Sequence, residues 1–294
     1  TKNKKSETFE KLEKKTLRVY LTQIRRIDSK KQASWSKAMM GKEQVLFRNQ
    51  YREKIDGWYN GYLHIAVVYA IGITAMWVYI QHINAVAWYE WLTIPVTIVL
   101  ANIFEWFLHK YVMHRRINFF GLRAIYERHT LNHHKFFTDE EIRFRGQEDW
   151  RVTVFPPYAL VIFIMMSLPG VAVFSYLFGS NVGWLFICST TGMYLTYEFM
   201  HFCCHVDENR FVRHMPFINT LRRHHVAHHN RSLMMEVNMN LTFPIADWLF
   251  GTSDLNRGLI GHLFNGYSTK HLKDNLRSQP KSPIEASKGP VPTE

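Results

Sequence analysis

Four apolar runs, each close to the length of a membrane-spanning helix, constrain this chain more than any other feature. They comprise residues 62–80, 91–108, 155–178 and 182–200. About 20 apolar residues in a helix cross the hydrocarbon core of a bilayer, so each run is long enough to do so. We therefore predict an all-α integral membrane protein whose four transmembrane helices form two hairpins.

Lys and Arg are distributed unevenly around these runs. The short connections at residues 81–90 and 179–183 contain neither Lys nor Arg, whereas residues 1–60, residues 109–151 and the segment after His201 are strongly basic. Basic segments next to membrane helices stay in the cytoplasm. We therefore predict that both termini and the 109–151 segment are cytoplasmic and that both short connections lie on the opposite side.

The overall composition fits a chain that is partly embedded in a membrane and partly polar. Hydrophobic residues make up 47% of the 294 residues, yet the mean hydropathy of −0.19 is too polar for a chain that lies in the membrane throughout. The formal net charge of +12 favours nucleic acid or an anionic membrane surface as a partner. Because apolar spans are present, we prefer the membrane and expect no nucleic acid partner. The cysteines Cys188, Cys203 and Cys204 show no zinc-type spacing, so we interpret them as reduced packing residues.

Three regions differ in composition along the chain. Residues 1–60 are predicted to form basic helices on the membrane surface, although a solvated tail explains residues 1–15 equally well. Residues 61–272 are predicted to form the transmembrane domain. Residues 273–294 are rich in Pro, Ser and Lys, and we predict a disordered tail there.

Histidine is concentrated at the predicted cytoplasmic ends of the second and fourth runs. Spacings of three to five residues keep the imidazoles of a cluster on one helical face or within one turn of it. Neutral imidazole is the commonest protein ligand of first-row transition metals. These clusters therefore predict a metal site held by a cytoplasmic helical cap. The clusters are His109 and His114; His129, His133 and His134; His201 and His205; and His224, His225, His228 and His229.

The position of the clusters also bears on the class of protein. A metal transporter would place its ligands near the middle of the bilayer. Here all four clusters converge on one membrane face, which disfavours transport. A mixed segment at residues 238–252 follows the last cluster and is predicted to cap the site.

The residues around these histidines add a resemblance to a known family. Its motifs are Glu105-Trp-Phe-Leu-His109 with His114, Tyr197-Glu198-Phe-Met-His201-Phe-Cys-Cys-His205, and Leu221-Arg-Arg-His224-His225-Val-Ala-His228-His229. Phe155-Pro156-Pro157 and the ending Asp247…Phe-Gly-Thr252 add to them. Over residues 60–255 the chain resembles the fatty acid hydroxylase branch of the sterol desaturase and fatty acid hydroxylase superfamily. These motifs are specific to the superfamily but much less so to a substrate.

The chain also departs from the family pattern. Three residues separate His129 from His133, where the fatty acid 2-hydroxylases usually have two, so His129 matches the pattern least well. The interval between His205 and His225 is longer than the family pattern implies. Asn240 stands where the family has a glycine. The haem signature His-Pro-Gly-Gly of a fused cytochrome b5 domain is not found, which implies a separate electron donor of the ferredoxin or cytochrome b5 type.

Ten imidazoles suffice for two metal ions with four or five ligands each and room for an exogenous ligand. Spacing alone does not choose the metal, because zinc and copper would bind such a site at least as well as iron. The resemblance implies two iron ions, with zinc as a substitute. Side chains that could support the ligands are expected at Glu105, Glu198, His224 and Asn238. The predicted ligands are His109, His114, His129, His133, His134, His201, His205, His225, His228 and His229.

The resemblance implies O2-dependent hydroxylation of a lipid acyl chain drawn from the bilayer. Three alternatives remain open at this point. A lipid desaturase or sterol methyl oxidase uses similar boxes, and so does a carotenoid hydroxylase. A zinc-binding membrane scaffold would keep the ligands and need no electron donor.

Overall fold

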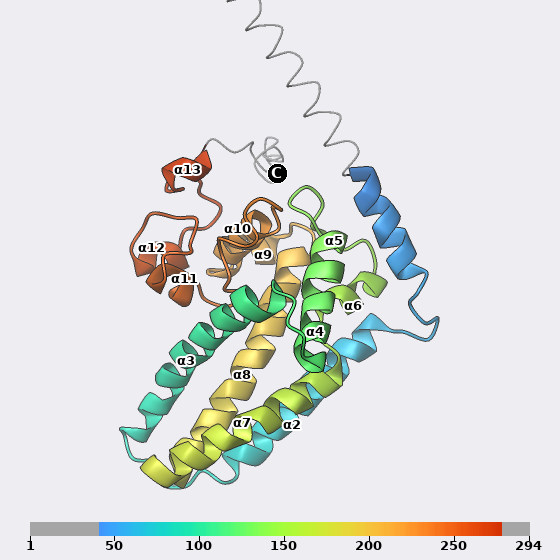
Figure 1. Cartoon of the computed structure of the whole chain (residues 1–294). Helices are drawn as coiled ribbons and strands as arrows, with labels where there is room; N and C mark the ends of the chain where they lie inside the picture. The colour runs from blue at the N-terminus through green and yellow to red at the C-terminus, as the bar shows by residue number, and fades with distance from the viewer. Residues whose placement is uncertain (1–40, 278–294) are drawn as a thin grey trace, which may run out of the picture. The chain divides into compact units, whose positions relative to one another are not determined.

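Four long helices follow the four apolar runs of the sequence (Figure 1). The computed structural model describes residues 41–277, and within that range the structure is helical, with no β-strand. The all-α prediction is therefore confirmed for this part of the chain. The long helices are α2 (Gly61–Ile80), α3 (Thr93–Leu108), α7 (Pro157–Phe178) and α8 (Ser180–His205).

The chain divides into two compact units, Thr1–Gln50 and Tyr51–Glu294. Within the first unit the description covers residues 41–50, which are helical. The surface helices predicted for residues 1–60 are described only from residue 41 onward. The disordered tail predicted for residues 273–294 is described only as far as residue 277, and residues 274–277 are helical. The remainder of both segments lies outside the described residues. All of the candidate site residues belong to the second unit.

Among the described residues, three helical stretches are long and apolar enough to cross a membrane. They are Gly61–Ile80, Glu90–Met113 and Gln147–Phe178. Few of their side chains are buried against protein, as expected for helices that face lipid. Helix α8 is longer than α2, at 26 residues, but it is not among these three. A fourth span therefore remains a prediction.

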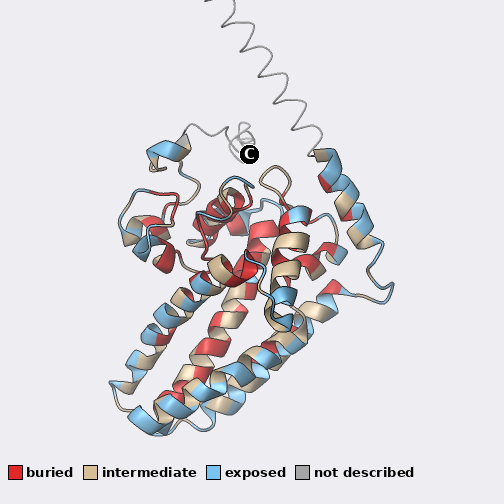
Figure 2. Ribbon diagram, in the orientation of Figure 1, coloured by how far each residue is buried: buried red, intermediate tan, exposed pale blue. Residues whose placement is uncertain are grey.

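The position of α8 explains why its composition is more polar. It packs against α2, α3 and α7, and buried residues recur along its whole length (Figure 2). Thr190, Thr191 and Glu198 are among these buried residues. A helix surrounded by other helices meets protein rather than lipid, so its polar groups can find partners there: Glu198 accepts from the backbone N–H of Phe155 at 3.1 Å.

Both hairpins close at the end of the helices that is distant from the histidine clusters. Gly179 ends α7 with a φ of 101°, a conformation that favours glycine. A Cβ on Gly183 would lie 1.9 Å from Ser175 Oγ, so the close approach of α7 and α8 requires glycine there. The side chain of Asn181 bonds both the backbone of Asn84 and the carboxylate of Glu90, which joins the two hairpins.

Short elements gather at the opposite end of α3 and α8 (Figure 1). They connect α3 to α7 and follow α8, so this end carries most of the polar part of the second unit. They are η2 (His109–Met113), α4 (Phe120–Tyr126), η3 (Glu127–His133), α5 (His134–Phe136), η4 (Gln147–Asp149), α6 (Trp150–Thr153), α9 (Arg210–His214), α10 (Ile218–His228), α11 (Ile245–Leu249), α12 (Leu259–Leu263) and α13 (Asp274–Arg277).

We expect a cysteine introduced at Asn84 to react with a membrane-impermeant thiol reagent applied outside intact cells. Asn84 is exposed and lies in the connection that has neither Lys nor Arg. A cysteine at Phe120, which is 90% exposed at the other end, should react only after the cells are opened. Labelling of both positions from the same side would contradict the two-hairpin topology.

Candidate metal centre

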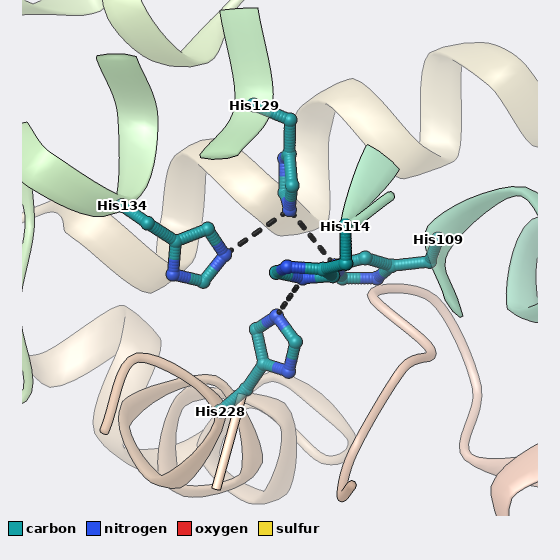
Figure 3. Close-up of side chains that lie close together, drawn as sticks. All are labelled: His109, His114, His129, His134 and His228. Atoms are coloured by element: carbon teal, nitrogen blue, oxygen red, sulfur yellow. Dashed lines mark hydrogen bonds between the residues drawn. The ribbon is translucent and has the colours of Figure 1, made fainter. Parts of the chain in front are cut away.

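The structure brings all ten predicted ligand imidazoles together, although they come from four separate clusters. Among the described residues they form two groups. His109, His114, His129, His134 and His228 make up the first group, whose ligand nitrogens lie within 4.8 Å of one another (Figure 3). His133, His201, His205 and His225 make up the second, within the same limit. His229 joins the second group, because its Nε2 lies 3.1 Å from that of His133 and 3.0 Å from that of His225.

Two π-helical segments explain how the first two clusters supply these groups. Both η2 and η3 are π-helices, in which hydrogen bonds run from residue i to i+5. Residues five apart therefore lie over one another: the rings of His109 and His114 are stacked at 5.0 Å, and Nε2 of His129 lies 3.1 Å from Nε2 of His134. His133 is four residues after His129 and turns to the second group. His129, which matched the family pattern least well, thus lies fully within the first group.

The last turn of helix α10 contributes one imidazole to each group. His228 belongs to the first group, and its Nε2 lies 3.0 Å from that of His114. Nε2 of His225, three residues earlier in the same turn, lies 2.9 Å from Nε2 of His205 in the second group. His224 points elsewhere: its Nε2 lies 3.8 Å from a carboxylate oxygen of Asp254. The supporting role of His224 remains a prediction.

The distances between ligand nitrogens fit metal coordination. Seven Nε2–Nε2 approaches within the two groups fall between 2.9 and 3.2 Å. Metal–imidazole bonds of about 2.0–2.1 Å separate neighbouring nitrogens by about 2.9 Å at a right angle and about 3.3 Å at a tetrahedral angle. The observed range lies between these values, as expected for ions with more than four ligands.

Backbone carbonyls fix the orientation of four imidazoles. His205 Nδ1 lies 2.8 Å from the carbonyl oxygen of Ile142, and His228 and His229 are bound in the same way by Val237 and Phe137. Nδ1 of His109 bonds the carbonyl of Met239. A carbonyl only accepts, so Nδ1 carries the proton and Nε2 presents its lone pair.

Each group contains two imidazoles fixed in this way. Their unprotonated nitrogens point into the same small buried space and repel one another unless a cation lies between them. All ten rings are at most 5% exposed, so water does not screen this repulsion. The donor set therefore fits metal ions, whose identity it does not decide.

Burial keeps these imidazoles neutral and hence able to bind metal. Burial first, and neighbouring imidazoles second, lower the pKa of His129, His134 and His225 well below the ordinary value. Burial lowers the pKa of His228 to about 4, against the opposing effect of its bond to Val237. Burial and the neighbouring His228 lower the pKa of His114 to about 2.

The expected supporting carboxylates act on the backbone rather than on imidazoles. Glu105 accepts hydrogen bonds from the backbone N–H groups of Leu241 and Thr242, and Glu198 accepts from the N–H of Phe155 at 3.1 Å. The prediction that these carboxylates orient ligand rings directly is therefore corrected. Glu105 positions the loop in which the carbonyl of Met239 bonds Nδ1 of His109.

The segment at residues 238–252, predicted to cap the site, comprises a loop followed by α11, and the sequence did not indicate its contacts. Asp247 accepts from the backbone N–H groups of Met239 and Asn240, at 2.9 and 2.7 Å. Asn238 has a φ of 58°, a conformation that asparagine adopts more readily than most residues. Its side chain bonds the carbonyl of His224 and the N–H of Asp254, which joins this loop to α10. Asn240, the departure from the family's glycine, bonds the carbonyl of Asn102.

We expect the metal-free protein to lose stability as the pH falls below about 6.5, the pKa of histidine in an unfolded chain. The unfolded state then binds protons that the buried imidazoles of the folded state do not bind. For His228 this contribution is complete above about pH 6.5 and is lost as the pH falls toward its folded pKa of about 4. The loss is about 1.4 kcal/mol per pH unit for each such histidine.

Thermal unfolding of the metal-free protein in detergent checks this expectation. The melting temperature should be lower at about pH 5.5 than at about pH 7.5. In the variant His228→Asn the difference should be smaller, because one buried imidazole is gone. An identical melting temperature at both pH values would contradict the prediction.

Comparisons with known proteins add one structural likeness. No family model matches the chain, and no curated protein matches it. Among solved structures, the chain is similar to one described as full length Scs7p, with only the hydroxylase domain visible, at 16% sequence identity and a TM-score of 0.46. The match covers 66% of this chain and 66% of that one, just under two thirds of each.

Proposed function

We propose that this chain is a membrane-embedded di-iron monooxygenase that hydroxylates a lipid acyl chain. The observation that carries the proposal is the convergence of ten buried imidazoles into two groups at one end of helices α3 and α8. One metal ion would not need so many ligands. The resemblance of the histidine boxes to those of fatty acid hydroxylases supports the choice of reaction.

The first group and the second group would each hold one iron ion, and the bound pair would activate O2. The chain itself holds and orients the ligands through the carbonyl contacts of His109, His205, His228 and His229. It also excludes water, because each of the ten rings is at most 5% exposed. All ten donors are neutral, so a metal-loaded site is strongly cationic and electrophilic. Zinc would fit the same donors but would not support redox chemistry.

The position of the site supports a substrate taken from the bilayer. His109 directly follows α3, and His205 is the last residue of α8. An acyl chain lying among the lipids beside these helices would therefore have a short distance to travel to the imidazoles. We propose that the site and both termini are cytoplasmic, where the basic segments belong under the positive-inside rule.

Hydroxylation of this kind has a defined balance of atoms and electrons. One C–H bond, one O2, two electrons and two protons yield one C–OH bond and one water. A separate electron-transfer protein of the ferredoxin or cytochrome b5 type would supply the electrons. The choice of iron and of this donor both belong to the proposal.

The decisive experiment supplies 18O2 to the iron-loaded protein with lipids of the host membrane and a ferredoxin donor system. We expect a lipid product that has gained one labelled oxygen atom, with none formed by the variant His225→Ala. Products that have lost two hydrogens and carry no label would show that the reaction is desaturation rather than hydroxylation. A label on a sterol methyl group or on a carotenoid would show that the substrate is a sterol or a carotenoid rather than an acyl chain. Iron-loaded protein that consumes no O2 with any lipid class would favour the metal-binding scaffold.

A further inference from the structure

A small cavity lies against imidazoles of both groups. Its volume is about 10 Å³, and its walls include His129 from the first group and His133 and His201 from the second. This volume is close to the lower limit for a single water molecule. A molecule of one or two heavy atoms placed there would lie beside both candidate metal positions.

The opposite wall is formed by α6 and the residues that follow it. Val152, Thr153 and Phe155 line the cavity there. Thr153 is 2% exposed, and its Oγ1 has no hydrogen-bond partner within residues 41–277. Buried hydroxyls without a partner are rare, and each one calls for a physical explanation.

The polar groups around Thr153 already have partners of their own. Arg128 donates to the carbonyls of Arg151 and Val154, at 2.8 and 2.6 Å. The N–H of Phe155 is bonded to Glu198. Tyr197 of α8 also lines the cavity, and its buried hydroxyl likewise has no partner among the described residues. Nδ1 of His133 and Nδ1 of His201 also lack a partner there, so apart from the imidazoles the free capacity of the lining lies in two hydroxyl groups.

We propose that this cavity binds the small exogenous ligand of the metal pair and that the hydroxyl of Thr153 donates the hydrogen bond that orients it. The inference rests on the proposed function in one respect, that the two groups hold metal. The ligand it selects is small, uncharged and able to accept a hydrogen bond. Val152 and Phe155 contribute apolar surface, which disfavours a hydrated ion. Arg128 also lines the cavity, and its guanidinium donates to two backbone carbonyls.

Nitric oxide is a suitable probe, because it has two heavy atoms, is uncharged and binds ferrous iron without turnover. The iron-loaded protein is titrated anaerobically with nitric oxide, and the N–O stretching band is recorded by infrared spectroscopy in H2O and in D2O. We expect the band of the wild-type complex to shift in D2O, because the hydrogen bond comes from an exchangeable hydroxyl.

Thr153→Val removes the hydroxyl at nearly constant volume. It should leave the iron content unchanged, raise the dissociation constant for nitric oxide about fivefold, as the loss of one ordinary hydrogen bond does, and abolish the D2O shift. Thr153→Ser should restore both. Thr190→Val is the matched control, because Thr190 is also buried but donates to the carbonyl of Phe186 and does not line the cavity.

The inference is overturned if Thr153→Val retains iron and binds nitric oxide with unchanged affinity and an unchanged D2O shift. If this variant fails to fold, the wild-type spectrum decides, since a band insensitive to D2O also overturns it. The test involves no turnover, so it is independent of the hydroxylation assay. Wild-type protein that binds no iron would overturn both the inference and the proposed function, whereas a Thr153 effect without hydroxylation would leave the inference standing.

Discussion

His225→Ala should lower the bound metal and abolish lipid turnover, whereas His224→Ala should retain most of the metal. Nε2 of His225 lies 2.9 Å from that of His205 and 3.0 Å from that of His229, inside the second group. The neighbouring ring of His224 faces Asp254. Successive residues of a helix point in different directions, so the ring of His224 faces Asp254 while that of His225 faces the second group.

Metal content per chain, measured by mass spectrometry after passage through a chelating buffer, checks this prediction. His224 is completely buried, so its truncation leaves a cavity and should lower stability by roughly 2–4 kcal/mol. His224→Gln, which fills more of the space, is the better-folded companion variant. Burial and the nearby Arg223 lower the pKa of His224 to about 3, so neither substitution removes a charge. Equal metal loss in the His224 and His225 variants would contradict the assignment.

His133→Ala and His134→Ala should each lose one metal ion of the pair, but from different groups. The two residues are adjacent in sequence, yet His133 lies 3.2 Å from His201 in the second group and His134 lies 3.1 Å from His129 in the first. Each variant should therefore fall from two bound ions to one when the free metal concentration is buffered. Both should lose turnover almost completely, because the proposed reaction needs both ions.

Cobalt(II) substitution distinguishes the two variants. The visible spectra of the single remaining cobalt ion should differ between them, since the surviving ligand sets differ. Summed, the two spectra should approximate the spectrum of the wild-type protein. Identical spectra, or loss of both ions in either variant, would show that the two groups do not act as separate sites.

Much of the fold is predictable from local properties of the chain. The helices α2, α3 and α7 begin and end close to the predicted bounds, because a long apolar run has few alternatives to a helix in lipid. Helix α8 was predicted as a fourth span of the same kind. Its burial among three other helices instead allows a more polar composition, and no property of a single run indicates which helix will be the inner one.

The candidate ligands were equally accessible to sequence reasoning, but their partners were not. Ten histidines at short spacings at the ends of two helices predict a metal site without any knowledge of the fold. The carbonyls that orient His109, His205, His228 and His229 belong to residues that carry no chemical signature, because any residue presents a carbonyl. Carboxylates were therefore predicted in that role, and Glu105 and Glu198 hold backbone instead.

The amino-acid sequence by itself determined the helical class, the long helices and the identity of the imidazoles that meet, because hydropathy and residue type are local properties. The tertiary structure alone decided how those imidazoles divide between two groups. That division depends on two π-helical segments, which place residues five apart over one another, and on α10, whose last turn reaches both groups. His133 and His134 are neighbours in the sequence, yet their rings point in different directions in the folded protein. The ring of His133 lies in the second group and that of His134 in the first.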